Sequence, residues 1–313
     1  MARIAVYGAT GSTGRLVARR LAAAGAELVL AGRTEARLRA AAPPGAAIAV
    51  APLDDPRALA RALEGCAAVV NCAGPFLDQG APVLEAALEA GVAYADTAAE
   101  QAWVHRVFER YGPLAEERGV ALVPAAGLDF LPGDLACALA ADGLGPLRSL
   151  DVAYAVDGFR LSGGSLRSAL AGIRRRPLTY ADGAWRFGLA RPGRVAFPPP
   201  FGGRSVVPFP AGEVVTAPRH VAVERVRTRI AATPFVLGAG RGRWMVVADA
   251  EAQDGRRRRA AVHGTDVYAT TAACAAHAAT LLAEGAGAGA LAPAQAFAPE
   301  PFLDHVGLAH VTT

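Results

Sequence analysis

The chain has 313 residues, a net charge of +4, a hydrophobic fraction of 53% and four cysteines. This length can bury one large core, and it favours two connected domains. No apolar run reaches the roughly eighteen residues of a membrane span, and Met1 leads directly into an apolar strand pattern rather than a signal peptide. We therefore expect a cytoplasmic protein. The cysteines form no Cys-x-x-Cys pair, which argues against a disulfide framework or a cysteine zinc site.

The basic side chains are arginines and histidines, because the sequence contains no lysine. The arginines are scattered apart from two runs, at 174–176 and 256–259, and such runs are typical of solvated loops rather than nucleic-acid contacts. The histidines show no metal-binding spacing such as His-x-x-x-His. The sequence therefore predicts no nucleic-acid partner and no bound metal.

Residues 1–145 alternate short apolar runs with longer helical patterns, as parallel βαβ units do. We expect an α/β domain of the Rossmann type, with a doubly wound parallel sheet. The expected strands are Arg3–Tyr7, Glu27–Ala31, Ala47–Ala51, Ala68–Asn71, Ala93–Asp96 and Ala121–Pro124. The expected helices lie at 14–24, 35–41, 56–63, 80–90 and 101–117.

The pattern changes after Pro146 to arginine-rich, strand-like pieces separated by proline and glycine loops. These pieces favour a largely antiparallel sheet, in a second α+β domain over residues 146–265. A helical pattern resumes at "DVYATTAACAAHAATLLAEG". Residues 266–313 are expected to pack back on the first domain, with the stretch from Gly285 onward as a surface excursion. The expected strands are Ser149–Asp157, Val214–Thr216, Arg225–Ala231 and Trp244–Ala250.

A glycine-rich segment, "GATGSTG" at residues 8–14, follows an apolar strand and opens an amphipathic helix, as a dinucleotide-binding turn does. Gly8 would permit the tight turn, Gly11 the close approach of a pyrophosphate, and Gly14 the contact between helix and sheet. The N–H groups at the helix start would face the phosphates. The alternative is a purely structural turn. The predicted cofactor-binding residues are Gly8, Thr10, Gly11, Ser12, Thr13 and Gly14.

The second strand indicates which dinucleotide binds. An NAD site usually has an acid at the end of this strand, whereas here Gly32 is followed by Arg33. An arginine suits a 2′-phosphate, so we predict NADP(H), with Arg33 as the discriminating residue and Arg37 in support. The alternative is a solvated surface arginine. Asp54 is predicted either to accept from the adenine amino group or to cap the next helix.

A loop of small residues follows the fourth strand, beside the point where a doubly wound sheet changes direction. A nicotinamide would lie there. For Cys72, packing is favoured over a nucleophilic role, because no paired base accompanies it. The residues predicted to contact the ring are Asn71, Cys72, Ala73, Gly74 and Pro75.

Four segments resemble the saccharopine dehydrogenase-like oxidoreductases, and in particular the branch that contains trans-acting enoyl reductases. They are the glycine segment, "VVNCAGPFLDQGAPVLEAALEAGVAYADTAAE", "RGVALVPAAGLDFLPGDLA" and, more weakly, "LSGGSLRSAL". The resemblance implies a Rossmann domain, an inserted substrate domain, NADPH, hydride transfer and a homodimer. Phe130 occupies the place of a serine in the branch's usual loop, so one hydroxyl is missing.

The absence of lysine excludes a Tyr-x-x-x-Lys pair and a lysine Schiff base. A proton would come from a carboxyl group, a tyrosine, a histidine or water near the nicotinamide. The catalytic candidates are Asp96, at the end of the fifth strand, and Asp129 and Asp134, on the loop after the sixth. Helix capping is the alternative for Asp96 and Asp134. The candidate substrate-binding residues are Ser162 and Ser165, at an expected helix N-terminus. The alternative is a helix-capping sequence with surface arginines.

These observations favour an NADPH-dependent oxidoreductase. It would transfer hydride to a C=N or activated C=C bond of a small or acyl-chain substrate. The alternative is a Rossmann protein that binds NADP(H) as a sensor or partner-binding module without turnover.

Overall fold

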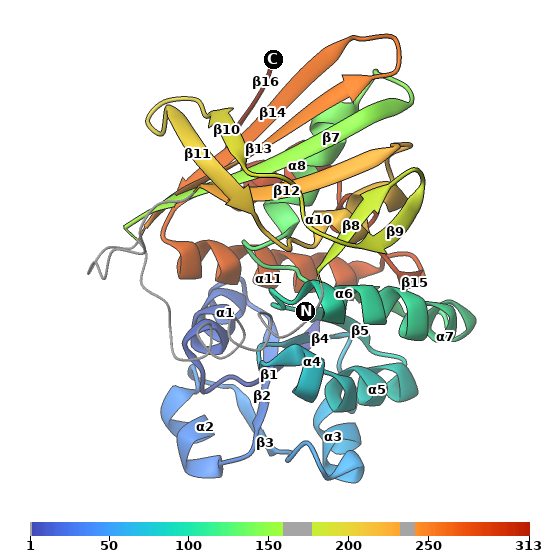
Figure 1. The fold of residues 1–313 in the computed structure, drawn as a ribbon. Coiled ribbons are helices and arrows are strands. Elements are labelled where there is room, and N and C mark those ends of the chain that lie inside the picture. Colours follow the sequence, from blue (N-terminus) through green and yellow to red (C-terminus); the bar gives the residue numbers. More distant parts are fainter. Residues whose placement is uncertain (1, 159–176, 232–241) are drawn as a thin grey trace.

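A parallel sheet forms the core of the first half of the protein in the computed structural model, which describes residues 2–158, 177–231 and 242–313 (Figure 1). Its strands lie in the order β15-β6-β5-β4-β1-β2-β3. Because the order reverses between β1 and β4, the sheet is doubly wound, as predicted. The strands are β1 (Arg3–Tyr7), β2 (Glu27–Gly32), β3 (Ala47–Val50), β4 (Ala68–Asn71), β5 (Ala93–Asp96), β6 (Ala121–Val123) and β15 (Gly289–Ala290).

Helices cover both faces of this sheet, because successive strand residues point to opposite sides. Ile4, Val6 and Leu30 pack against α1, α2 and α11 on one face, and Val29 and Val69 pack against α3, α5 and the helices after β5 on the other. Figure 1 shows α11 lying between this domain and the second sheet. The helices are α1 (Ser12–Ala23), α2 (Glu35–Ala41), α3 (Pro56–Leu63), α4 (Phe76–Gln79), α5 (Ala81–Ala90), α6 (Gln101–Arg106), the π-helical η1 (Val107–Tyr111), α7 (Gly112–Glu117) and α11 (Val267–Glu284).

A second, mixed sheet follows the order β10-β11-β12-β7-β13-β14-β16, with the β8–β9 hairpin joined to β12. Most of its pairs are antiparallel, as expected, but β7 and β12 run parallel. Its strands are β7 (Leu147–Asp157), β8 (Leu178–Ala181), β9 (Ala184–Phe187), β10 (Gly193–Ala196), β11 (Gly203–Pro208), β12 (Arg225–Ala231), β13 (Arg243–Ala252), β14 (Arg257–Thr265) and β16 (Ala309–Thr312). The remaining helices are α8 (Leu131–Ala141), α10 (Glu213–Thr216), the 3-10 turn η2 (Ala217–Arg219), α12 (Pro293–Ala296) and α13 (Pro299–His305).

The strand expected at Val214–Thr216 is wrong, because these residues belong to the short helix α10. All four residues of α10 are buried, including Glu213. A short apolar run cannot be assigned to a strand or a buried helix by periodicity alone, since both bury every residue. The correction matters because α10 brings Glu213 into the interior.

The chain returns to both sheets after α11, so the expected surface excursion from Gly285 onward is also wrong. β15 pairs with β6 in the first sheet, and β16 pairs with β14 in the second. Ala292, Phe302 and Leu303 are buried in the core shared with α8. Helix α8 packs against β13 and β14 of the second sheet, although the sequence predicts that it belongs to the first domain, residues 1–145. The second domain therefore also contains residues that precede 146, in α8, and residues that follow 265, in β16.

Candidate cofactor and active site

The glycine turn after β1 is closed by its own backbone. Gly8 has a φ of +76°, in the left-handed region, and its carbonyl oxygen accepts a hydrogen bond from the Gly11 N–H at 3.0 Å. A Cβ on Gly14 would lie 2.4 Å from that oxygen, so glycine is needed for α1 to pack here. A Cβ on Gly11 would meet only the Gly8 oxygen, at 3.4 Å, and Gly11 is exposed. The turn is therefore tightly packed on its inner side and open at Gly11.

The N-terminus of α1 is suited to an anion. No side chain caps it, and its first turn contains no acidic residue. The first N–H groups of a helix have no partner within the helix and carry partial positive charge. Ser12 is exposed, and Thr10 and Thr13 are half-buried around this end. The residues present therefore fit the pyrophosphate of a dinucleotide.

Arg33 and Asp54 follow β2 and β3, two strands that are paired in parallel in the sheet. The pKa of Tyr7 is raised to about 12, mainly by burial. The charge of Arg33 lowers this pKa and the charge of Asp54 raises it, so both side chains act on the Tyr7 hydroxyl. Arg33 is exposed and forms no ion pair with any described residue. Asp55, rather than Asp54, caps α3 by accepting from the Ala58 N–H at 2.9 Å. The helix-capping alternative for the exposed Asp54 is therefore wrong, and its contact with the adenine amino group stays a prediction.

The loop after β4 lies directly against the glycine turn. A Cβ on Gly8 would be 3.0 Å from the Cβ of Ala73. Asn71 is fully buried, and its Oδ1 accepts a hydrogen bond from the Ala73 N–H at 3.0 Å. This side chain therefore stabilises the conformation of the loop. Ala73, Gly74 and Pro75 are only half-buried. Contact between this loop and a nicotinamide stays a prediction.

Cys72 is the only half-buried residue of the four free cysteines, and the other three are buried. Burial raises the pKa of Cys72 to about 12, and a hydrogen bond with Thr97 offsets only part of this increase. The group is therefore a neutral thiol at physiological pH. This state supports packing over a nucleophilic role.

Asp96 is fully buried beneath the loops after β5 and β6. Its Oδ1 accepts from the N–H groups of Ala98, at 3.0 Å, and Ala125, at 2.8 Å. Its Oδ2 accepts from the Tyr94 hydroxyl, at 2.9 Å, and from Trp103 Nε1, at 2.7 Å. Burial raises the pKa of the Asp96 carboxyl, and these hydrogen bonds oppose that effect. The geometry suits a residue that positions both loops, since neither oxygen is left for a substrate.

Asp134 and Asp129 differ in what surrounds them. Asp134 is fully buried in α8, accepts from the Ala294 N–H at 2.9 Å and lies 2.9 Å from His220 Nε2. Asp129 is half-buried, and no described residue donates a hydrogen bond to it. Burial raises the pKa of Asp129 to about 6. Of the three acids proposed from the sequence, Asp129 therefore has the carboxyl best suited to give a proton to a ligand.

The structure brings three further polar residues into this region that were not predicted from the sequence, namely Glu213, Tyr154 and Gln101. The Tyr154 hydroxyl donates to Glu213 Oε1 within the core. Gln101, on α6, reaches the second domain, where its Nε2 donates to the carbonyl oxygens of Leu178, at 3.1 Å, and Ala211, at 2.9 Å. The signal for Glu213 was an acid inside an otherwise apolar run, "AGEVVTAP". The two serines proposed to bind substrate, Ser162 and Ser165, lie outside the described residues.

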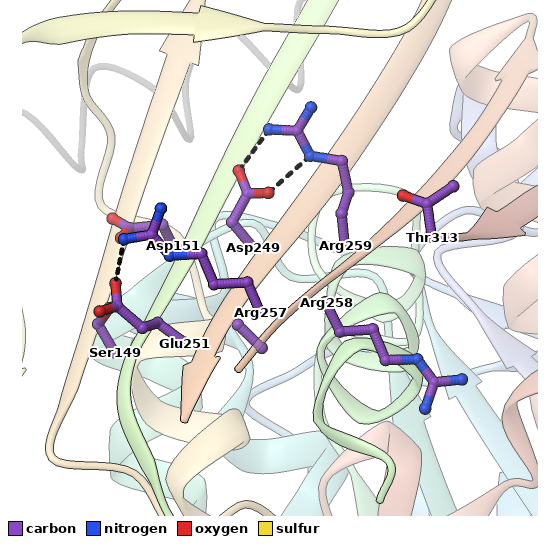
Figure 2. Close-up of a pocket in the computed structure, with 9 residues that line it drawn as sticks. Ser149, Asp151, Asp249, Glu251, Arg257, Arg258, Arg259 and Thr313 are labelled. Carbon is purple, nitrogen blue, oxygen red and sulfur yellow. Dashed lines mark hydrogen bonds and ion pairs between the residues drawn. The ribbon is translucent and has the colours of Figure 1, made fainter. Parts of the chain in front are cut away.

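A cavity of about 460 Å³ lies elsewhere, on the outer face of the second sheet (Figure 2). Its charges are already paired, since Arg259 contacts both oxygens of Asp249 and Arg257 contacts Glu251. Strand alternation places Asp249 and Glu251 on the face opposite Ala250, which packs in the core with α8. This cavity therefore faces away from the glycine turn, and we do not assign the active site to it.

Comparison with known proteins identifies the first domain. The model of the saccharopine dehydrogenase NADP binding domain matches residues 4–123. These residues form a saccharopine dehydrogenase NADP-binding domain. The match covers the glycine turn, Arg33 and the loop after β4, and it confirms the family resemblance and the NADP cofactor predicted from the sequence.

Curated relatives match part of this chain. The trans-acting enoyl reductase of Mycobacterium tuberculosis is 36% identical over 145 residues, which is 42% of this chain and 34% of that protein. A lipid droplet localized protein of Caenorhabditis elegans is 34% identical over 146 residues, again 42% of this chain and 34% of that protein. The chain thus spans about a third of the length of these relatives.

The whole fold is similar to a solved structure of saccharopine dehydrogenase (L-Glu forming) from Saccharomyces cerevisiae. The two have a TM-score of 0.69 at 15% sequence identity, over 100% of both chains. At this identity the similarity establishes the fold alone. None of the helices in the described segments is long and apolar enough to cross a bilayer, and the cytoplasmic location stays a prediction.

Two glycine substitutions should separate packing from cofactor binding. Gly14→Ala places a Cβ against the Gly8 carbonyl and is expected to lower the free energy of unfolding by about 1–3 kcal/mol. Gly11→Ala is expected to leave stability within about 1 kcal/mol, yet weaken NADPH binding roughly 10-fold or more by blocking the pyrophosphate. Urea unfolding and fluorescence titration measure the two effects. Unchanged NADPH affinity in Gly11→Ala would contradict the pyrophosphate assignment.

Proposed function

We propose that this chain is an NADPH-dependent reductase that saturates a C=N or activated C=C bond of a small or acyl-chain substrate. The observation that carries the proposal is the position of Asp129. Its half-buried carboxyl follows β6 at the carboxyl edge of the sheet, and the glycine turn lies at the same edge. Ligands of open α/β sheets bind at this edge. Bound NADPH would supply the hydride, and Asp129 would supply the proton.

Other residues of the chain bind and orient the cofactor. The open side of the glycine turn and the N-terminus of α1 bind the pyrophosphate, and Arg33 binds the 2′-phosphate. Ala73, Gly74 and Pro75 orient the ring. Gln101 joins α6 to the second domain, which would cover the bound substrate and exclude water.

One relative supports an order among the proposed substrate classes. The trans-acting enoyl reductase is 36% identical over 145 residues, which is 42% of this chain, and enoyl reduction acts on a C=C bond. The proposal therefore puts an activated C=C bond of an acyl chain first and a C=N bond second. The homodimer suggested by the sequence resemblance stays a prediction.

The proposal is tested by fluorescence titration with NADPH and NADH, followed by NADPH-oxidation assays against panels of enoyl thioesters and imines. We expect selective NADPH binding and turnover on one panel. Selective binding without turnover on either panel would favour the sensor alternative. Failure of both nucleotides to bind would contradict the cofactor site itself.

Arg33→Ala is expected to raise the Kd of NADPH by about 10- to 100-fold and to change the Kd of NADH little. The physical reason is the loss of a charge-assisted contact to a phosphate that NADH lacks. Arg39→Ala is the matched control, because Arg39 lies on the neighbouring helix and pairs with Glu35. Equal losses for the two nucleotides would contradict the assignment of Arg33 to the 2′-phosphate.

A further inference from the structure

Helix α11 packs against the helix α1 of the glycine turn through a stripe of alanines. The stripe shares one core cluster with Val17, Ala18 and Leu21 of α1, and the two helices are in contact. Residues at this spacing lie on one face of a helix, and short side chains let two helix axes come close. The position of α11 is therefore fixed relative to the helix that we assign to the pyrophosphate. The alanines of the stripe are Ala272, Ala275, Ala276 and Ala279.

A second face of α11 is directed to the core around the loop that carries Asp129. Val267, Cys274 and Ala278 lie on this face and belong to the same core cluster as Leu128, which directly precedes Asp129. Thr271 lies on this face too, because positions 267, 271, 274 and 278 recur at helical spacing, and it is buried. One helix thus connects α1 with the loop after β6.

The side chain of Thr271 makes two contacts with this loop. Its Oγ1 accepts a hydrogen bond from the Leu128 N–H at 3.4 Å, and a Cβ on Gly127 would lie 3.0 Å from its methyl carbon. The Thr271 hydroxyl donates its own proton to the Val267 carbonyl oxygen at 2.9 Å. This bond orients the side chain and leaves an oxygen lone pair for the loop. Both contacts are made to the two residues that directly precede Asp129.

These contacts give Thr271 control over the middle of the loop. Asp96 accepts from the Ala125 N–H and so holds the start of the loop. For residues 127–130, Thr271 provides the one hydrogen bond that comes from outside the loop and α8 within the part of the chain that the structure describes. The position of Asp129 therefore depends on α11 as well as on the acid beneath the loop.

We propose that Thr271 is a positioning residue that sets where Asp129 lies relative to the bound nicotinamide ring. The proposal rests on the proposed reductase function. Because α11 contacts both α1 and the loop, it gives the cofactor site and the proton donor one common support. In this scheme Thr271 touches neither substrate nor cofactor and acts through the backbone of Leu128. It holds the Asp129 carboxyl within reach of the atom that receives the proton, and proton transfer requires that reach.

Thr271→Val tests the hydroxyl, because valine keeps the methyl group but cannot accept from the Leu128 N–H. We expect kcat for NADPH oxidation to fall about 10-fold or more, since small displacements of a reacting group are costly. The Kd of NADPH should stay the same. Thr271→Ala, which removes the same hydroxyl, should repeat the result, and Thr271→Ser, which keeps it, should recover most of the rate.

Thr280→Val is the matched control for these variants. Thr280 is half-buried on the same helix, and its hydroxyl also donates to the carbonyl oxygen four residues earlier, at 3.1 Å. Among the described residues it has no hydrogen bond to the loop that carries Asp129. Thr280→Val should therefore leave kcat and the Kd of NADPH unchanged. Circular dichroism checks that each variant is folded.

The Asp129→Asn background distinguishes positioning from a general loss of structure. If Thr271 acts through Asp129, Thr271→Val should lower kcat in the wild-type background and add little once Asp129→Asn has removed the acid. A general structural defect would lower kcat by the same factor in both backgrounds, and that result would overturn the proposal.

Hydrogen exchange of the purified chain tests the contact without turnover. Leu128 is buried and its N–H is bonded to Thr271, so this amide should exchange faster in Thr271→Val than in the wild type, Thr271→Ser or Thr280→Val. Unchanged exchange or an unchanged kcat in Thr271→Val would overturn the positioning role and leave the reductase standing. A wild-type protein without turnover on either panel would remove the reductase, and the positioning role with it, even when the exchange at Leu128 changes as expected.

Discussion

Asp129→Asn is expected to lower kcat for NADPH oxidation by about 100-fold or more, because an amide cannot donate the proton that accompanies the hydride. The Kd of NADPH should stay the same, since Asp129 follows β6 and the glycine turn follows β1. Stopped-flow or steady-state assays with the best substrate of the panels measure the rate.

The pH dependence makes this prediction specific. The acid form of Asp129 is the active form, so the rate should fall as pH rises through the raised pKa of Asp129, about 6. This alkaline limb should be lost in Asp129→Asn. Asp142→Asn is a matched control, because Asp142 follows α8 and its side chain is 77% exposed. An unchanged rate and limb in Asp129→Asn would assign the proton to another group or to water.

Asp96→Ala is expected to lower the free energy of unfolding by about 3–5 kcal/mol, the largest stability effect we predict. The substitution leaves four donors without an acceptor in a dry interior, namely the Ala98 and Ala125 N–H groups, the Tyr94 hydroxyl and Trp103 Nε1. Ala125 has a φ of +58°, a conformation that alanine rarely adopts, and Asp96 holds its N–H in place. Urea unfolding followed by circular dichroism measures the loss.

The same substitution tests which role Asp96 has. A positioning role predicts that NADPH binding and turnover decline together with stability, because the loops after β5 and β6 both depend on this carboxyl. Glu117→Ala, at an exposed position of α7, should change stability by less than about 0.5 kcal/mol. A stable Asp96→Ala protein that binds NADPH and yet has lost turnover would instead support the direct catalytic role proposed from the sequence.

The first domain could be predicted from the sequence in detail. The observed strands β1, β4 and β5 and the helices α2 and α3 have the expected bounds. These elements are set by local patterns: strands of the sheet are apolar throughout, helices show an apolar face, and glycines end three of the helical patterns with a left-handed φ at Gly25, Gly91 and Gly119. The glycine turn and Arg33 could also be predicted as cofactor-binding residues, because a dinucleotide site lies on consecutive βα units.

The active-site acids could be predicted only as a set. Asp96, Asp129 and Asp134 all follow or adjoin strands at the right edge of the sheet, and nothing in the sequence separates them. Their hydrogen-bond partners distinguish these acids. Asp96 accepts hydrogen bonds from residues within 30 positions in the sequence, whereas Asp134 accepts one from Ala294, which is 160 residues away. Only the fold brings such partners together.

The sequence by itself determined the Rossmann domain, its glycine turn, the preference for NADP and the candidate acids, because each depends on residues close together in the chain. The tertiary structure decided the rest. Tyr154 and Glu213 are 59 residues apart, and the contact between them requires β7, α8 and α10 to be packed together. The helical state of α10 and the return of β15 and β16 to the two sheets likewise depend on burial against distant elements, which short apolar runs do not encode.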